Sequence, residues 1–560
     1  MKILISTLNS KFTHSSLAIM SIKKFSTIYN EQYNDHIFLK EFTINHHDEY
    51  IVSNIFKENP DIICFSCYIW NIDKTKQIIS VLKKILPHVK IILGGPEVSF
   101  DYEELIERSI ADIIVIGEGE QTFFELMQYF LEDGNTTLHS IKSIAFLDEG
   151  VCVSTQKRPA LSLDAIPFPY TSEDLNYLKD RIIYYESSRG CPFECAYCLS
   201  SIDRGVRFLS LQRTYSDLRF FLDEKMPKVK FIDRTFNCNA ERTEKIWRFL
   251  IENDNGITCF HFEVCADILT DKLLDCLKYA REGLFQFEIG VQSTNPRTLD
   301  EIRRNTNFEK LSDFVVKIRK LNNIHLHLDL IAGLPLEDLE SFGRSFDDVY
   351  FLNPHKLQLG FLKLLKGSYL HDNADFFGIV CEDKSPYTVL YTKDMSFADI
   401  CKLREIEKVL DIFYNSKKFY YTLKFVLDNV SSPFQFYLEY SEYLEAKRFF
   451  DMPHSSIALY DIFFQYCSES LYDQIDIIKE LLIFDLYRID KVTKLPSFIE
   501  KRDTLIRQQG RSHHVQQFYY NVLNWIENDF KRILKEETVV LFTYNKSEKG
   551  YASFKKVESK

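Results

Sequence analysis

The first 135 residues alternate short apolar runs with segments whose apolar positions repeat at the helical period. The apolar runs read KILIST, HIFLKEFTI, DIICFSCYIW, VKIILGG and ADIIVIG. Because strands that alternate with helices form parallel sheets, we predict an open, doubly wound α/β domain over residues 1–135. Such sheets bind ligands at the carboxyl ends of their strands, so the candidate binding loops are STLNSKFTHSS, SCYIWN, GGPEVS and GEGE.

A second, more regular alternation covers residues 183–370. Its apolar runs are IIYYESS, VKFIDRTF, CFHFEVCAD, LFQFEIGVQS, HLHLDLIAGLP and KLQLGFLKLL, and its helix-period segments lie near 211–224, 241–253, 271–282, 308–321 and 337–352. Six β/α repeats predict a partial, TIM-like parallel barrel, either closed or open on one side. In barrels of this kind the catalytic side chains lie at the C-terminal ends of the strands.

The segments on either side of the barrel have different patterns. Residues 136–182 contain IPFPY, and because proline removes a backbone donor and disfavours helix at the preceding residue, we interpret this range as a linker. Residues 371–560 consist mostly of helix-period segments, among them HHVQQFYYNVLNWIENDFKRILKEE, and end in an apparent hairpin, TVVLFTYNKSEKGYASFKKV. We therefore predict a mainly helical C-terminal domain. Adjacent residues on a helix point in different directions, so we interpret His513 and His514 as exposed side chains and not as metal ligands.

Composition and charge limit the possible functions. Apolar residues make up 45% of the 560-residue chain and charged residues 27%, which indicates a globular protein with ample core. The net charge of −12 argues against a dedicated nucleic-acid surface. The chain starts directly with a strand pattern instead of a signal peptide, and no run approaches the length of a membrane span. We therefore expect a cytoplasmic protein without membrane association.

Three of the 13 cysteines stand apart from the others. Most of the 13 lie in apolar strands, where free Cys behaves as a small buried hydrophobe. Cys191, Cys195 and Cys198 instead form a cluster in ESSRGCPFECAYCLSS, directly after the first predicted strand of the barrel. Three thiolates on one loop can bind three irons of a [4Fe-4S] cluster and leave the fourth iron open. A zinc site with a distant fourth ligand and a redox pair of Cys195 and Cys198 are the alternatives.

The surroundings of the three cysteines resemble a known family, and neither alternative explains them. C-x3-C-x2-C with an aromatic residue before the last cysteine, EIGVQSTN on the fourth barrel strand and DLIAGLP on the fifth resemble the radical S-adenosylmethionine (SAM) enzymes, particularly the branch with coproporphyrinogen oxidases and methylthiotransferases. The resemblance implies that Cys191, Cys195 and Cys198 bind a [4Fe-4S] cluster. An electron from a donor such as flavodoxin or ferredoxin would then split SAM into methionine and a 5′-deoxyadenosyl radical.

The resemblance also implies a set of SAM-binding residues. Tyr197 would lie over the adenine, and the polar residues that would hold the amino acid and ribose groups of SAM are Glu263, Gln292, Arg304 and Asp329. Carboxylate, amide and guanidinium groups match the ammonium, carboxylate and hydroxyl groups of SAM. For each of these four polar residues, an ion pair within the barrel is the alternative interpretation.

The parallel sheet in front of the barrel narrows the resemblance to one subclass. A five-strand domain with GGPEVS and GEGE that precedes a radical SAM core resembles the cobalamin (B12)-binding radical SAM enzymes, and the third region resembles an uncharacterised C-terminal domain of some members. The resemblance implies a Rossmann-like, cobalamin-binding domain over residues 1–135. Ser66, Gly94 and Gly95 would adjoin the nucleotide tail and the corrin edge, since glycine lets the backbone approach a bulky ligand closely.

Two departures from the family pattern leave residues without a clear role. The glycine-rich segment that usually follows the second barrel strand is replaced by DRTFNCN, which makes Asp233 and Asn237 polar candidates. The Asp-x-His-x-x-Gly motif of classical cobalamin domains is absent, and the corresponding loop contains His14. His14 is therefore either a cobalt ligand or a residue that packs within its loop.

The activity that the resemblance implies is cobalamin-dependent methyl transfer to an unactivated carbon. The alternatives are a radical SAM enzyme that catalyses rearrangement, cyclisation or hydrogen abstraction, and a non-catalytic Fe–S redox or sensor protein. A passive cluster needs no SAM-binding residues, so Gln292, Arg304 and Asp329 argue against the sensor. The sequence does not distinguish a peptide, a lipid and a small metabolite as the substrate.

Overall fold

The computed structural model describes residues 1–132, 136–202, 205–489, 494–499, 513–528, 530–544 and 551–557. The chain divides into two compact units. Unit 1 consists of Met1–Asp338 and Gly360–Phe397, and unit 2 of Leu339–Leu359 and Ala398–Lys560. Among the described residues, no helix is both long enough and apolar enough to cross a membrane.

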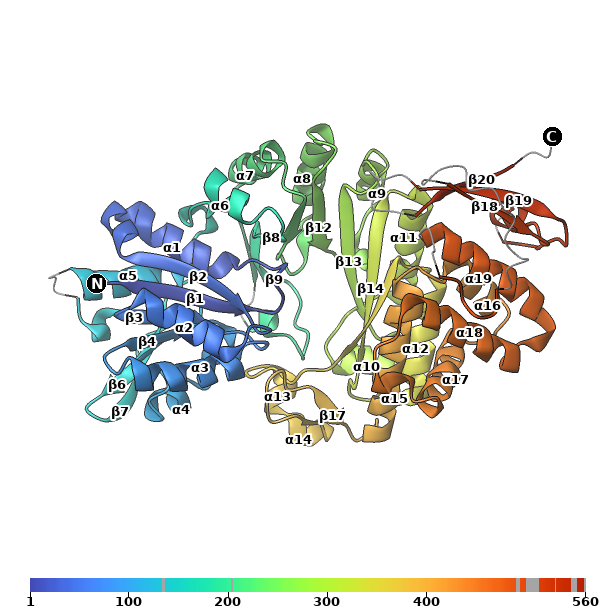
Figure 1. Ribbon diagram of the computed structural model, residues 1–560. Helices are drawn as coiled ribbons and strands as arrows, with labels where there is room; N and C mark the ends of the chain where they lie inside the picture. The colour runs from blue at the N-terminus through green and yellow to red at the C-terminus, as the bar shows by residue number, and fades with distance from the viewer. Residues whose placement is uncertain are drawn as a thin grey trace. The chain divides into compact units, whose positions relative to one another are not determined.

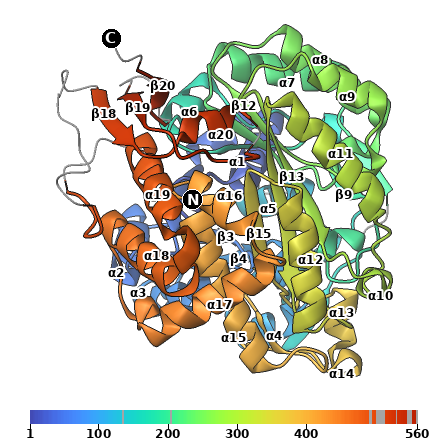
Figure 2. The same ribbon diagram turned by 90° about the vertical axis from the view of Figure 1, so that its right-hand side faces the viewer.

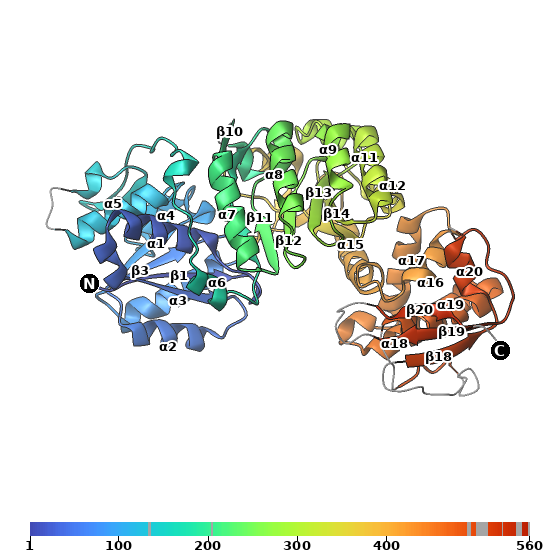
Figure 3. The ribbon, with the colours of Figure 1, turned by 90° about the horizontal axis from the view of Figure 1, so that it is seen from above.

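The N-terminal part of unit 1 is a doubly wound sheet, as predicted. Five parallel strands lie in the order β2-β1-β3-β4-β5, and their bounds are β1 Ile3–Asn9, β2 Ile37–Thr43, β3 Ile62–Ser66, β4 Lys90–Gly94 and β5 Ile113–Val115. Helices cover both faces (Figure 1 and Figure 3), with one pair, α1 Leu17–Tyr29 and α5 Glu120–Leu131, on one face and a second pair, α2 Asp48–Glu58 and α3 Ile72–Ile85, on the other.

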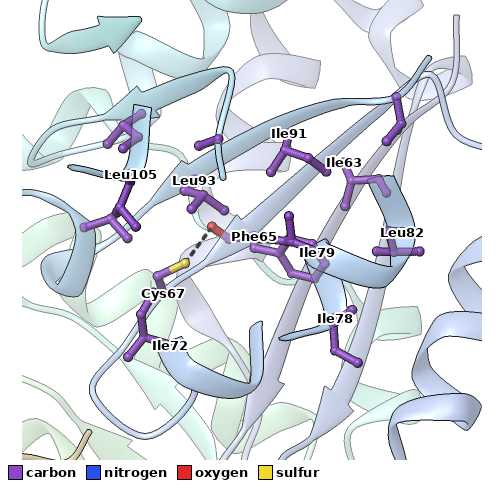
Figure 4. Packing of buried hydrophobic residues seen from close by; sticks show 14 of the residues in the cluster. Ile63, Phe65, Cys67, Ile72, Ile78, Ile79, Leu82, Ile91, Leu93 and Leu105 are labelled. Carbon is purple, nitrogen blue, oxygen red and sulfur yellow. Dashed lines mark hydrogen bonds between the residues drawn. The ribbon is translucent and has the colours of Figure 1, made fainter. Parts of the chain in front are cut away.

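The centre of this sheet is apolar on both faces. All five residues of β3 are buried, and Ile63 and Phe65 pack under Ile79 and Leu82 of α3 (Figure 4). When helices cover both sides of a parallel strand, neither of its faces meets water, so its sequence is a continuous apolar run. The strands therefore supply the core, and the loops at their ends are left to bind ligands.

Part of the range that we interpret as a linker belongs to this sheet. β6 Ile144–Asp148 pairs antiparallel with β5, and β7 Val151–Ser154 pairs antiparallel with β6. The sheet therefore has seven strands among the described residues. The rest of the range contains the short helix α6 Ser172–Tyr177 and leads into the barrel.

The second sheet is the predicted partial barrel. Its strands lie in the order β15-β14-β13-β12-β11-β8, with β8 and β15 at the edges, so the barrel is open. The boundary between the two units runs through β15. The bounds of the strands are β8 Ile183–Tyr185, β11 Lys228–Phe231, β12 Cys259–Glu263, β13 Phe285–Gln292, β14 Ile324–Ala332 and β15 Lys356–Phe361. The helices of unit 1 that cover its outer face (Figure 1) are α7 Leu211–Asp223, α8 Ala240–Glu252, α9 Asp271–Leu277 and α11 Phe308–Leu321.

The barrel strands alternate between an apolar outer face and a polar inner face. On the outer face, the Trp247 ring of α8 stacks on Phe287 of β13 with their centroids 5.1 Å apart. On the inner face, Glu288 Oε2 lies 2.9 Å from both Lys230 Nζ and His261 Nε2. Closed TIM barrels fill this space with branched apolar side chains. The open barrel instead presents a polar surface there.

Unit 2 is mostly helical, as predicted (Figure 2). Its helices are α12 Leu339–Phe351, α15 Phe397–Val409, α16 Tyr420–Leu427, α17 Pro433–Ala446, α18 Ser456–Ser470 and α19 Ile475–Ile489. The C-terminal hairpin is confirmed, because β19 Thr538–Thr543 pairs antiparallel with β20 Ser553–Lys556. Phe484 of α19 packs on Phe542 of β19 with their ring centroids 5.3 Å apart.

The predicted helix over residues 513–537 is wrong at both ends. β18 His513–Phe518 pairs antiparallel with β19, and the helix α20 covers only Val522–Glu527. Local periodicity favours a helix here, but pairing with a distant strand decides the conformation, as is common for strands. The His514 ring stacks on Tyr487 with centroids 3.7 Å apart, so it is a packing residue.

Candidate active site

The three clustered cysteines lie on a β-hairpin at the C-terminal end of β8. β9 Ser188–Cys191 pairs antiparallel with β10 Gly205–Phe208, and the loop between them carries Cys195 and Cys198. Gly190 has φ +102°, and a Cβ at this position would lie 2.1 Å from the carbonyl oxygen of Gly205. Only glycine allows this approach of the two strands, so the hairpin requires a glycine directly before Cys191.

Backbone hydrogen bonds fix the cysteine loop on both sides. The Ala196 N–H donates to Ile302 O at 2.9 Å, and Ala196 O accepts from the Leu370 N–H at 2.9 Å. Within the loop, the Cys198 N–H donates to Cys195 O at 3.1 Å. The loop is therefore held by the barrel and also by the segment that follows β15.

Asp233 anchors the start of the hairpin. Its buried carboxylate accepts hydrogen bonds from Ser187 N at 2.8 Å, Ser187 Oγ at 2.7 Å and Ser188 Oγ at 2.6 Å. Burial raises the pKa of Asp233 to about 6, although these hydrogen bonds oppose the rise. Asp233, whose role is open from the sequence, thus holds the residues that lead into Cys191.

Arg304 connects the cysteine loop with the end of β13. Its Nη1 lies 3.7 Å from Cys195 Sγ and 3.2 Å from Tyr197 Oη, and its Nη2 donates to Gly290 O. Burial raises the pKa of Cys195, and the charge of Arg304 opposes that rise. A guanidinium is thus placed directly beside the cysteine cluster.

Gln292 and Asp329 both adjoin Gly290 on β13. Gly290 pairs with Asp329, and the register then shifts by one residue, so Gln292 adopts φ +72°. A Cβ on Gly290 would lie 2.2 Å from Gln292 Nε2, so the glycine makes room for the amide. Strained non-glycine residues of this kind are concentrated at functional sites. Of the residues implied to bind SAM, the structure brings together Tyr197, Gln292, Arg304 and Asp329.

Glu263 is part of the polar inner face of the barrel. Its Oε1 lies 3.8 Å from Lys230 Nζ, while Lys230 makes the shorter contact with Glu288. Burial raises the pKa of Glu263, and the charges of Arg234 and Lys230 oppose the rise. Glu263 therefore takes part in the kind of ion pair that is the alternative interpretation for each of these residues.

A fourth thiol near this site was not singled out from the sequence. Asn237 accepts from the Cys265 N–H at 2.8 Å and donates to Cys265 O at 2.7 Å, so its amide clamps the end of β12. The Cys265 thiol donates to Asp267 Oδ1 at 2.8 Å. The position of Cys265 directly after a barrel strand, in EVCAD, is the signal that could have marked it.

The loop residues of the first sheet make contacts that the sequence did not predict. Ser66 pairs with Gly94, and a Cβ on Gly95 would lie 2.4 Å from Cys67 O. Gly95, which has φ +115°, is thus needed for the close approach of two backbone segments. His14 forms a β-bridge with Ile182, and its Nδ1 hydrogen-bonds to Tyr184 Oη on β8. His14 therefore connects the first sheet to the barrel.

The segment from Gly360 to Phe397, which we name the strap, also returns to the strand ends. The Leu362 N–H donates at 2.9 Å to the carbonyl oxygen of Ala332, the last residue of β14. Tyr387 Oη hydrogen-bonds to Glu97 in the GGPEVS loop of the first sheet. Lys366 forms an ion pair with Asp101, which follows the same loop. The strap thus contacts the first sheet, the barrel and the cysteine loop.

The three thiols of the cysteine loop are compatible with an iron–sulfur cluster. Among the described residues, no three His, Cys, Asp or Glu side chains converge as the ligands of one ion do. The thiols of Cys191, Cys195 and Cys198 are free of disulfides. A [4Fe-4S] cluster binds each cysteine to a different iron, so its ligands do not have to converge on one atom.

Comparisons with known proteins agree with this geometry. The family model of the B12 binding domain matches residues 5–127, and that of the Radical SAM superfamily matches residues 185–349. A third family, described as a protein of unknown function (DUF4080), matches residues 375–550.

Two curated relatives are similar in sequence to about half of this chain. The "Uncharacterized methyltransferase PH0819" of Pyrococcus horikoshii is 28% identical over 52% of this chain and 64% of its own length. The "Cobalamin-dependent radical SAM methyltransferase TokK" of Streptomyces tokunonensis is 27% identical over 50% of this chain and 44% of its own length.

The matched region thus spans about half to two thirds of these relatives. The structure of the "Cobalamin-dependent S-adenosylmethionine radical enzyme OxsB" superposes with a TM-score of 0.61 at 17% identity, over 87% of this chain and 79% of that one, which shows a shared fold. The chain therefore carries a B12-binding domain, a radical SAM domain and an additional C-terminal domain of the DUF4080 family.

Proposed function

We propose that this protein is a cobalamin-dependent radical SAM methyltransferase that acts on an unactivated carbon. One observation carries the proposal: the strap hydrogen-bonds both to Glu97 in a strand-end loop of the B12-binding sheet and to Ala196 in the cysteine loop. Because one segment contacts both the B12-binding sheet and the cysteine loop, we infer that the two sites take part in a single reaction. The relatives named as methyltransferases support the same activity.

The residues of the barrel divide the task of binding. Cys191, Cys195 and Cys198 would hold a [4Fe-4S] cluster and leave one iron open for SAM. Arg304 would receive the SAM carboxylate, because its buried guanidinium already lies within reach of Cys195 and Tyr197. Gln292 and Asp329, which both adjoin Gly290, would bind the remaining polar groups of SAM.

The bound groups would supply the reactive species. With an electron from a donor such as a flavodoxin or ferredoxin, the cluster and SAM supply a 5′-deoxyadenosyl radical, and cobalamin supplies the methyl group. The chain's part is to exclude water and to hold the substrate carbon near both groups.

Anaerobic reconstitution tests the proposal. Protein loaded with iron, sulfide and hydroxocobalamin should bind near-stoichiometric corrinoid and, once reduced, convert SAM into both S-adenosylhomocysteine and 5′-deoxyadenosine. The Cys191→Ala/Cys195→Ala/Cys198→Ala variant should lose the cluster and the 5′-deoxyadenosine. A wild-type protein that forms 5′-deoxyadenosine but binds no corrinoid would exclude methyl transfer and leave another radical SAM reaction. A triple variant that still cleaves SAM would refute the cluster assignment.

A further inference from the structure

Two arginines on the cysteine hairpin bind the same carboxylate of the first sheet. Arg189 of β9 and Arg207 of β10 are directly opposite each other in the antiparallel ribbon. Arg189 Nη1 lies 3.1 Å from Glu118 Oε2, and Arg207 Nη2 forms an ion pair with the other oxygen, Oε1. One carboxylate thus connects both arms of the hairpin that carries the cluster ligands.

A second carboxylate strengthens this connection. Glu120 Oε1 lies 2.8 Å from Arg189 Nη2, and its residue is only 5% exposed. Glu120 is the first residue of α5, where the helix dipole also favours a negative charge. Arg189 in addition contacts Glu186 at 2.6 Å, so three carboxylates surround two guanidinium groups. Charge-assisted hydrogen bonds between such groups are directional as well as strong.

These contacts involve the Gly-Glu-Gly-Glu segment that follows β5. From the sequence, this segment is a candidate binding loop at the carboxyl edge of the first sheet. In the structure, both of its carboxylates form ion pairs with the hairpin arginines. Gly117, with φ +77°, provides the turn that directs Glu118 toward the hairpin.

We propose that Glu118 and Glu120 are positioning residues that hold the cysteine loop at a fixed separation from the B12-binding sheet. This inference rests on the proposed function, since a fixed separation matters only when both cofactors serve one reaction. Neither residue has to touch a cofactor. A misplacement of about 1 Å between reacting groups can cost about 100-fold in rate, which gives such a connection its value.

The matched control is on the same helix. Glu125 of α5 pairs with Arg158, whose Nη1 lies 3.0 Å from Glu125 Oε1, and this pair does not include the hairpin. Glu118→Gln, Glu120→Gln and Glu125→Gln each replace one carboxylate with an amide of the same shape. Only the first two remove a charge that faces Arg189 or Arg207.

Hydrogen exchange of the full-length protein without added cofactors tests the connection itself. Amides in residues 188–202 and 205–208 should exchange at least several-fold faster in Glu118→Gln and Glu120→Gln, and at the wild-type rate in Glu125→Gln. The double variant Glu118→Gln/Arg207→Met should exchange more slowly than the product of the single effects predicts, by about threefold or more, because both substitutions break one contact. Unchanged exchange in both glutamate variants, or strictly multiplicative effects, would overturn the inference.

Pulsed electron paramagnetic resonance tests the consequence for the cofactors. In protein that holds cob(II)alamin and a reduced cluster, the dipolar coupling between the two spins should be sharp for the wild type and for Glu125→Gln. It should broaden for Glu118→Gln and Glu120→Gln, while iron and corrinoid contents stay at wild-type levels. A sharp, unshifted coupling in both variants would refute the positioning role. Wild-type protein without corrinoid would instead refute the proposed function and the positioning role with it, and the exchange data would still report on the ion pairs.

Discussion

β3 of the first sheet and β13 of the barrel are both central parallel strands, but they use their side chains differently. All five residues of β3 are buried, whereas β13 alternates buried Phe285, Phe287 and Ile289 with partly exposed or polar residues. Helices cover both faces of the first sheet and only the outer face of the barrel (Figure 1). A strand with two covered faces can only build core, so ligand chemistry there belongs to the loops. A strand with one open face can carry functional side chains along its length.

The largest difference between the two strands should appear when the core around β3 is disrupted. Phe65→Ala removes a ring that is 2% exposed between the sheet and α3, and we expect a loss of about 3–5 kcal/mol in the free energy of unfolding. Urea denaturation followed by circular dichroism measures it. Lys90→Ala on β4 removes an exposed side chain and should change stability little. If the two variants were equally stable, β3 would not be the rigid core described here.

The next effect should appear at the strand ends of the barrel. Gln292→Ala and Asp329→Ala should keep the cluster but weaken SAM binding by about 1.5–3 kcal/mol each, the value of a hydrogen bond to a charged group. Calorimetric titration of the reconstituted protein with SAM measures the affinity. Gln286→Ala, two residues before Glu288 on the same inner face, is the control and should bind SAM as the wild type does. Full affinity in both test variants would assign Gln292 and Asp329 a structural role.

The smallest expected effect is a change in how folding stability depends on acid pH, through the polar inner face of the barrel. Burial alone would raise the pKa of Glu288, but the hydrogen bond with His261 and the charge of Lys230 outweigh burial and lower it. A carboxyl group whose pKa is lower in the folded protein stabilises the fold above its unfolded pKa, about 4.3, and this contribution disappears as the pH falls further. His261, whose pKa is lowered by burial, changes stability in the same direction at somewhat higher pH.

Thermal unfolding between about pH 3 and 7 measures this acid dependence. The melting temperature of the wild type should fall more steeply on acidification below about pH 4.3 than that of Glu288→Gln, because the amide cannot take up the proton. Glu282→Gln, which changes an exposed residue just before β13, should follow the wild-type curve. Parallel curves for wild type and Glu288→Gln would show that the polar face contributes nothing to acid stability.

Local patterns predicted most of the elements and the central motif. The apolar runs at KILIST and DIICFSCYIW are strands β1 and β3, and the helix-period segment 308–321 is α11 within the same limits. These predictions succeed because burial of one or both faces imposes a short-range period on the sequence. The three cysteines and Tyr197 lie within eight residues, so their association is also local.

Predictions that depend on distant partners were less successful. The segment 513–518 has a helical period but is a strand, because pairing with β19 decides its conformation. The close approach of Gly95 to the Cys67 carbonyl, 2.4 Å from where a Cβ would lie, was likewise not predicted. Asp233 and Asn237 had no role until the structure paired them with Ser187 and Cys265.

The strand and helix pattern of both sheets and the C-x3-C-x2-C loop with its aromatic neighbour could be predicted from the sequence, because they depend on periodicity and spacing over a few residues. Which charges face each other became visible only in the folded protein. Arg189 and Glu120 are 69 positions apart, and Tyr387 and Glu97 are 290 apart. Such contacts arise only when the packing of whole sheets brings distant loops together, and no local pattern in the chain encodes that meeting.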